Sequence, residues 1–178
     1  MRAGKNPSPL TTPTAPGLHA RSRARLRLQF FDGGSRGNPG LAGCGAALFP
    51  RGGGAPLDTA HAYLGTATSN EAEYQGLILG LSLALRHGAT DVAICGDSKL
   101  VVNQLNGVWQ IRNPRLARLL DVVKCDLLPS FGRWEVRHVY REANGVADAL
   151  ANEAMDSARY GAVPRLPSQS AGGACTAC

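Results

Sequence analysis

Hydrophobic and polar positions alternate in several segments of this chain, and each such segment predicts a strand. Residues 25–31 alternate clearly, and apolar stretches predict further strands at 41–50 and 57–64. Short turns join these three segments, so we expect an antiparallel meander. Two more strands are expected at 91–97, where DVAICGD is largely apolar, and at 133–141, where RWEVRHVYR alternates.

Helical patterns separate and follow the later strands. The longest helix begins near Ser69, which can cap it, and stops at Gly88. A short helix is expected at 98–107, another begins at Pro114, and the last covers 143–161. The order β-β-β-α-β-α-α-β-α predicts the fold class α/β. We expect a five-stranded mixed sheet, three antiparallel strands followed by two parallel ones, flanked by helices.

The two ends of the chain differ from this region in composition and charge. Residues 1–24 are rich in Pro, Ser, Thr and Arg, and residues 162–178 in Gly, Ala and Ser, so we expect disordered tails around one domain at 25–161. Residues 1–27 hold six basic and no acidic groups, and the remainder holds thirteen of each. The net charge of +6 therefore belongs to the N-terminal arm. A solvated tail, a phosphate contact and an organelle transit peptide all stay open for it.

Hydropathy and cysteine usage indicate the cellular location that we expect for this protein. No apolar run approaches 18 residues, and no apolar segment near the start suggests a secretory signal, so we expect no membrane association. Cys44, Cys95 and Cys125 fall in apolar segments, which is typical of reduced thiols. Cys175 and Cys178 form a single CxxC, a weak zinc signal. We expect a cytoplasmic protein, with import into an organelle as the alternative.

The segment FFDGGSRGNPG, residues 30–40, places four glycines directly after an aspartate. A turn needs one or two glycines, so four of them predict backbone that lies close to another molecule. A plain hairpin turn is the alternative.

Four carboxylates lie where charge is not expected. Asp32 and Asp97 each end an apolar strand, and a right-handed α/β layout makes these two strands neighbours. Glu73 lies in the first turn of the longest helix, and Asp148 lies in the last helix. Both share a helical face with apolar or small residues, so both are expected to point inward.

Four such acids at one sheet edge would repel one another, by about 4 kcal/mol for each pair at about 4 Å and an effective dielectric of about 20. Carboxylate oxygens suit Mg²⁺ or Mn²⁺, and a pair of such ions catalyses phosphodiester cleavage. Each acid also has an ordinary explanation: a turn cap for Asp32, the helix dipole for Glu73, a helix cap for Asp97, and an ion pair with Arg141 for Asp148. The combination favours a metal site.

Four blocks of sequence together resemble type 1 ribonuclease H in order and spacing. They are FDGGSRGNPG, TSNEAEYQGLILGL, ICGDSKLVVNQLNG and HVYREANGVADALAN. Residues 106–114 form a short connection in place of a basic protrusion, which resembles the compact, reverse-transcriptase-like branch of the family. The resemblance implies an endoribonuclease that hydrolyses the RNA strand of RNA–DNA hybrids with two Mg²⁺ ions, or Mn²⁺, leaving 5′-phosphate and 3′-hydroxyl ends.

The resemblance also implies roles for individual residues. Asp32, Glu73, Asp97 and Asp148 fall on the family's metal-binding acids, and His138 falls on a mobile histidine that assists water attack or product release. A strand-end residue without a role is the alternative for His138. Substrate contacts are implied for Gly33, Gly34, Ser35, Asn38, Thr68, Ser69, Asn70, Lys99 and Asn144. Lys99 departs from the glutamine that family members often carry, and a lysine cannot offer the same bidentate hydrogen bonding.

Two other functions remain open. One is a catalytically weak or inactive module that binds hybrid or double-stranded RNA on the same fold. The other is a related phosphodiesterase that acts on structured DNA or double-stranded RNA. All four acids are present, which favours the enzyme, and the glycine-rich segment argues against DNA targets because bare backbone suits the 2′-hydroxyls of RNA. We expect a monomer.

Overall fold

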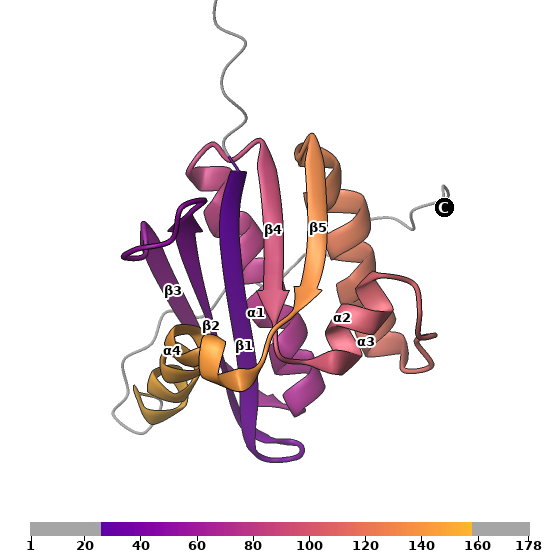
Figure 1. Cartoon of the computed structure of the whole chain (residues 1–178). Helices are drawn as coiled ribbons and strands as arrows, with labels where there is room; N and C mark the ends of the chain where they lie inside the picture. The colour runs from indigo at the N-terminus through magenta and orange to yellow at the C-terminus, as the bar shows by residue number, and fades with distance from the viewer. Residues whose placement is uncertain (1–25, 158–178) are drawn as a thin grey trace, which may run out of the picture.

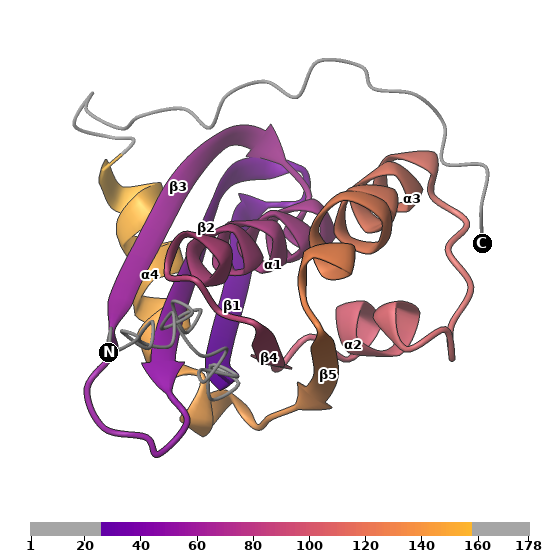
Figure 2. The same ribbon diagram turned by 90° about the horizontal axis from the view of Figure 1, so that it is seen from above.

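The computed structural model describes residues 26–157, which form a five-stranded sheet with helices on both faces (Figures 1 and 2). The strands are β1 (Leu26–Gly37), β2 (Gly40–Pro50), β3 (Asp58–Ala67), β4 (Asp91–Gly96) and β5 (Arg133–His138). Their spatial order is β3-β2-β1-β4-β5. The first three strands pair antiparallel, whereas β4 pairs parallel with β1, and β5 with β4. The predicted mixed sheet is therefore confirmed.

The regular helices are α1 (Ser69–Arg86), α2 (Lys99–Leu105), α3 (Pro114–Asp121) and α4 (Gly145–Ser157). Figures 1 and 2 show α4 on one face of the sheet and α1 on the other, with α3 beside α1. The single helix expected after Pro114 is divided, because α3 continues as a π-helical stretch, η1 (Val122–Leu127), and then as a 3-10 turn, η2 (Leu128–Ser130). Pro129, which has no N–H to donate, lies in that turn and ends the helix.

The arm and tail expected at residues 1–24 and 162–178 lie outside the described residues, as does the terminal CxxC, so the domain boundaries stay a prediction. Among residues 26–157, no helix has both the length and the apolar character needed to cross a membrane. Cys44, Cys95 and Cys125 are free thiols, and the first two are buried, as expected for small side chains in apolar segments.

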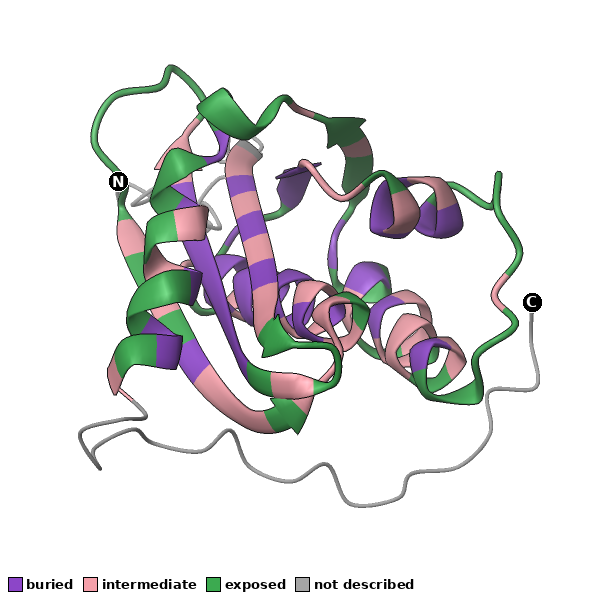
Figure 3. Cartoon of the chain, turned by 90° about the horizontal axis from the view of Figure 1, so that it is seen from below, coloured by how far each residue is buried: buried purple, intermediate pink, exposed green. Residues whose placement is uncertain are grey.

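The main core lies between the sheet and α1. From Leu28 to Gly34, the residues of β1 alternate between partly exposed and buried, as the banding of this strand in Figure 3 shows. Phe31 and Gln29 point toward α1, where Phe31 packs in one cluster with Tyr74 and Leu77. β4 is buried along its whole length, which explains its lack of alternation in sequence.

Helix α1 approaches the sheet very closely because glycine faces it on β1. A Cβ atom on Gly33 would lie 2.1 Å from the backbone carbonyl carbon of Ala72 in α1. A Cβ atom on Gly76 of α1 would lie 2.4 Å from the carbonyl oxygen of Asp32. Real Cβ atoms do not approach other atoms this closely, so both glycines allow the helix and strand backbones to touch.

The glycine-rich segment therefore has internal reasons for its composition. Gly33 is needed for packing against α1, and Gly37, with a φ of 94°, closes the hairpin between β1 and β2. The hairpin alternative thus explains Gly37 and also Gly40, where a Cβ would lie 2.1 Å from the Arg36 carbonyl oxygen, and close packing of a helix explains Gly33. Gly33 is also buried, which leaves its backbone little surface to offer to another molecule.

The start of α1 is capped by Thr68 and not by Ser69 as we expected from the sequence. Thr68 Oγ1 accepts a hydrogen bond from the backbone N–H of Glu71, and the Glu71 carboxylate accepts one from the backbone N–H of Thr68. This reciprocal arrangement is a capping box, and it satisfies two N–H groups that the helix leaves without partners. The stop at Gly88 is as predicted, since this residue has a φ of 63° just after the helix.

Candidate active site

Three of the four predicted acids meet at one point of the structure. Asp32, Glu73 and Asp97 each offer a carboxylate oxygen, and these three atoms all lie within 4.8 Å of one another. We call these residues the acidic triad. Parallel pairing of β1 with β4 ends at Phe30 and Cys95, and the residue two positions further along the chain from each is an acid of the triad, Asp32 within β1 and Asp97 just after β4. The close approach of α1 then brings Glu73 to the same point.

Two details differ from the sequence expectation. Asp32 does not end its strand, because β1 continues through it to Gly37 in antiparallel pairing with β2. Glu73 lies in the second turn of α1, and Glu71 is the acid of the first turn. The helix dipole, which acts mainly within the first turn, therefore does not explain Glu73. Nor does Asp97 cap α2, because Ser98 does so.

The triad is held in an environment that disfavours negative charge. Burial, and after it the charges of Asp97 and Asp148, raises the pKa of Asp32 to about 7. Burial, followed by the charges of Asp32 and Asp97, raises the pKa of Glu73 to about 9. Oxygen Oε2 of Glu73 is buried without a hydrogen-bond partner. Three clustered carboxylates with an unpartnered oxygen fit a hard divalent cation such as Mg²⁺, which prefers oxygen ligands.

Asp148 stands apart from the triad. Its Oδ1 accepts a hydrogen bond from Arg141 Nη2 at 2.5 Å, and Asn152 Nδ2 lies 3.3 Å from its Oδ2. The side chain of Asp148 is 27% exposed, so it does not point inward as fully as its helical position predicts. The ordinary explanation, an ion pair with Arg141, is the contact that is present. Asp148 is still close enough for its charge to raise the pKa of Asp32.

Asn144 and His138 both contact Asp97 from the segment between β5 and α4. Asn144 Nδ2 donates to Asp97 Oδ1 and to the carbonyl oxygen of Phe31, each at 2.9 Å. The Asn144 side chain is 1% exposed, so it supports Asp97 from inside and has little surface for the substrate contact that we expected. His138 ends β5, is exposed, and has Nε2 3.1 Å from the carbonyl oxygen of Asp97.

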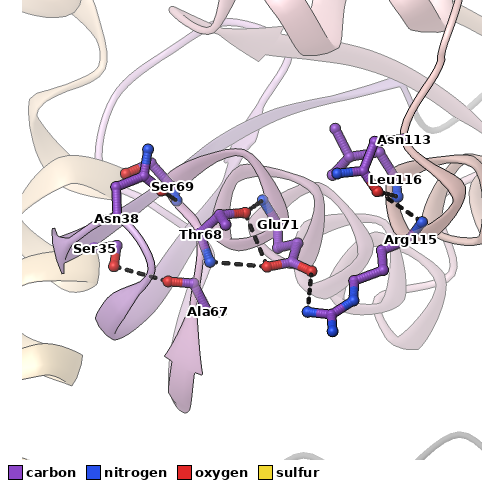
Figure 4. A network of polar contacts seen from close by, with 9 residues as sticks. All are labelled: Ser35, Asn38, Ala67, Thr68, Ser69, Glu71, Asn113, Arg115 and Leu116. Carbon is purple, nitrogen blue, oxygen red and sulfur yellow. Dashed lines mark hydrogen bonds and ion pairs between the residues drawn. The ribbon is translucent and has the colours of Figure 1, made fainter.

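The remaining substrate-contact residues lie mostly around the β1–β2 hairpin and the start of α1 (Figure 4). Ser35 Oγ lies 2.8 Å from the carbonyl oxygen of Ala67, and Asn38 Oδ1 accepts a hydrogen bond from the backbone N–H of Ser69 at 3.2 Å. Gly34 is partly exposed on β1, and Asn70 and Lys99 are exposed at the first turns of α1 and α2.

Sequence reasoning gave too little weight to two residues near the site. Arg141 was considered only as an ordinary ion-pair partner, although its charge acts on Asp32 and Glu73 as well as on Asp148. Arg115, at the start of α3, reaches Glu71 of the capping box at 3.5 Å (Figure 4). In the sequence, the only indication of this role for Arg141 was its position seven residues before Asp148, an expected metal ligand. For Arg115, 44 positions from Glu71, the sequence carries no local signal.

A mixed sheet in this strand order, with carboxylates just past the point where the parallel pairing of its two central strands ends, is the arrangement of the ribonuclease H-like class. The family model described as "Reverse transcriptase-like" matches residues 30–154. The chain is 41% identical over 155 residues to ribonuclease HI of Halobacterium salinarum, covering 87% of this chain and 74% of that protein. The chain therefore belongs to the type 1 ribonuclease H family, in its reverse transcriptase-like branch.

Solved structures of relatives support the same assignment. The N-terminal ribonuclease H domain of a protein from Mycobacterium tuberculosis is similar to this chain with a TM-score of 0.73 and 43% identity, covering 76% of this chain and 97% of the solved one. LC11-RNase H1, solved in complex with an RNA/DNA hybrid, has a TM-score of 0.68 and 34% identity, covering 75% and 99%. The chain spans 36% of the length of the full mycobacterial relatives that it matches.

Proposed function

We propose that this chain is a metal-dependent endoribonuclease that hydrolyses the RNA strand of RNA–DNA hybrids and leaves 5′-phosphate and 3′-hydroxyl ends. The observation that carries this proposal is the acidic triad, in which three carboxylates from separate elements offer oxygens within 4.8 Å of one another. The substrate is suggested by the relative LC11-RNase H1, which was solved with an RNA/DNA hybrid. We place the enzyme in the cytoplasm as a monomer.

Asp32, Glu73 and Asp97 would hold the first divalent cation, and Asp148 would complete the site for a second. Bound cations of this kind lower the pKa of a water ligand and stabilise charge on the attacking and leaving oxygens of a phosphodiester. Mg²⁺ is the ion that we propose, with Mn²⁺ as a substitute, because all four ligands are carboxylates.

The protein's own groups orient this site. Asn144 fixes Asp97 through the 2.9 Å hydrogen bond to its Oδ1, and the same amide ties Asp97 to β1 through the Phe31 carbonyl. His138 is exposed beside Asp97, and its ring can exchange a proton with solvent or with a leaving group at the edge of the site. We propose that His138 assists the reaction in this way.

Substrate would lie across the exposed surface near the β1–β2 hairpin and the first turns of α1 and α2. Gly34, Ser35, Asn38, Thr68, Ser69, Asn70 and Lys99 provide backbone, hydroxyl, amide and ammonium groups there. Such groups can contact 2′-hydroxyls and phosphates of a hybrid. Gly33 and Asn144 are buried, so we propose structural roles for them in place of direct substrate contact.

The test is cleavage of an end-labelled RNA–DNA hybrid by the wild-type chain and by Asp97→Asn, with Mg²⁺, with Mn²⁺ or with EDTA. We expect cleavage of the RNA strand only when a divalent cation is present, and a loss of at least about a hundredfold in Asp97→Asn because the triad loses one charged ligand. All-DNA and all-RNA duplexes serve as controls.

Cleavage of double-stranded RNA at a similar rate would favour the related phosphodiesterase. Binding of hybrid without cleavage under either metal would overturn the catalytic proposal, and the binding-module alternative would replace it.

A further inference from the structure

Arg141 sits beside the acidic triad and engages the one predicted metal ligand that lies outside it. It belongs to a 3-10 turn, η3 (Arg141–Ala143), in the connection that leads from the end of β5 past β1 to α4 (Figure 1). Its Nη2 donates to Asp148 Oδ1 at 2.5 Å. This contact joins a guanidinium to a carboxylate, so it is a charge-assisted hydrogen bond.

We propose that Arg141 competes with a divalent cation for Asp148, so that Asp148 joins the acidic triad only after its carboxylate has been released by the guanidinium. This inference rests on the proposed function, because it takes Asp148 as a metal ligand. It makes Arg141 a positioning residue that sets the difference in affinity between a first and a second cation.

The contacts of Asp148 contrast with those of Asp97. Asp97 is held in the triad by Asn144, a buried amide that ties it to β1. Asp148 is held away from the triad, because Arg141 faces its Oδ1 and Asn152 Nδ2 faces its Oδ2. Each carboxylate oxygen of Asp148 therefore already faces a hydrogen-bond donor, Arg141 for Oδ1 and Asn152 for Oδ2.

The contact with Arg141 can also be broken at small cost. The Arg141 side chain is 74% exposed, so its guanidinium can turn into water without losing solvation. Ion pairs between exposed side chains contribute little to stability, so a divalent cation can replace this one. A first cation bound by the triad needs no such displacement, and it is therefore expected to bind more tightly than the second.

The experiment is calorimetric titration of Mn²⁺ into four proteins: wild type, Arg141→Gln, Asp148→Asn and the double variant. We expect Arg141→Gln to tighten binding of the second ion about fivefold, the size of one exposed ion pair of about 1 kcal/mol. We expect no such gain when Arg141→Gln is made in the Asp148→Asn background, since the carboxylate for which the two cations compete is then absent.

Arg137→Gln is the matched control. Arg137 pairs with Glu135 on β5, where it lies opposite Cys95 of β4, and not with Asp148, so this change removes one arginine charge from the same end of the sheet without freeing Asp148. We expect it to leave the second binding step unchanged. Circular dichroism of all variants checks that each is folded.

The outcomes separate this inference from the proposed function. The same gain in the Asp148→Asn background, or in Arg137→Gln, would mean that Arg141 acts only through its general field, and would overturn the competition. An unchanged second step in Arg141→Gln, or none measurable in either protein, would overturn it as well. The proposed function fails separately, if the wild-type chain binds Mn²⁺ yet cleaves no hybrid.

Discussion

Burial, more than mutual repulsion, sets the charge state of the two most perturbed acids of the site. It is the largest cause of the raised pKa of both Asp32, at about 7, and Glu73, at about 9. Without a cation, each of these groups therefore tends to hold a proton near neutral pH. Binding of a divalent cation must displace those protons, which couples metal affinity to pH.

This coupling gives a prediction for stability. In the folded chain the pKa of Asp32 is raised from 3.8 to about 7, and the pKa of Glu73 from 4.5 to about 9. Between the ordinary and the raised pKa of each group, the folded chain therefore binds more protons than the unfolded chain. In EDTA, the stabilising contribution is complete below about pH 4 and is lost as the pH rises through about 7 and then about 9. We expect the melting temperature in EDTA to fall from pH 6 to pH 8. The melting temperature in Mg²⁺ should exceed the melting temperature in EDTA, and this difference should grow from pH 6 to pH 8. A difference that shrinks with rising pH would contradict this.

The hydrogen bonds of Asn144 predict the effect of its removal. Asn144→Ala frees Asp97 Oδ1 and the Phe31 carbonyl, both of which the amide now contacts at 2.9 Å. Loss of a residue that orients a metal ligand typically lowers activity or metal affinity about 10- to 100-fold. We expect a fall of this size in the rate of hybrid cleavage at fixed Mg²⁺, partly restored by higher Mg²⁺. Activity equal to wild type would show that Asp97 needs no support from this amide.

At the scale of elements, the position of the site depends on how closely two helices approach the sheet. Glycines make both approaches possible, since a Cβ on Gly33 would collide with the backbone of α1, and one on Gly45 would lie 2.5 Å from the Ala147 carbonyl oxygen of α4. These approaches bring α1, which carries Glu73, and α4, which carries Asp148, against opposite faces of the sheet. The triad is thus a consequence of backbone contact between elements as well as of its own side chains.

Gly33→Ala tests this dependence. The added methyl group meets the Ala72 backbone at 2.1 Å, so α1 must move, and we expect a loss of at least about 2 kcal/mol in the free energy of unfolding by urea. Gly52→Ala is the matched control, because a Cβ there meets nothing within 4 Å, and its effect should stay within about 0.5 kcal/mol. Equal stability of the two variants would mean that the helix can shift without cost.

At the scale of the whole molecule, the surplus of positive charge lies at the N-terminal end of the sequence. Residues 28–178 hold equal numbers of basic and acidic groups, and the surplus lies in residues 1–27. The short connection at residues 106–114 carries no basic protrusion, and Trp109 within it is 48% exposed and so is not buried in the core. Attraction to a hybrid's phosphates would therefore have to come largely from the arm.

Deletion of residues 1–24 tests the arm, since it removes Arg2, Lys5, Arg21 and Arg23. If these residues bind phosphates, affinity for hybrid should fall, and the slope of log affinity against log salt should decrease by about 0.9 for each phosphate that the shortened chain no longer neutralises. The cleavage rate at saturating hybrid should not change. An unaltered salt slope would identify the arm as a solvated tail or a targeting segment.

Much of this molecule follows from local sequence pattern. Alternation and apolar runs located the five strands, and the order of elements determined the mixed sheet, because strand and helix periodicities depend on neighbouring residues alone. The placement of Asp97 just after the end of β4 was predictable for the same reason, whereas Asp32 lies within β1 and does not end it. The family assignment also came from four blocks of sequence in their order and spacing.

Tertiary structure decided what local pattern cannot contain. It selected Thr68 over the adjacent Ser69 as the cap of α1, because the cap depends on which side chain faces the first free N–H groups. It packed the backbone of α1 directly against Gly33, and it buried Asn144 beside Asp97. It also paired Asp148 with Arg141 instead of placing it in the triad. These outcomes depend on distances between elements, which arise only when the whole domain packs.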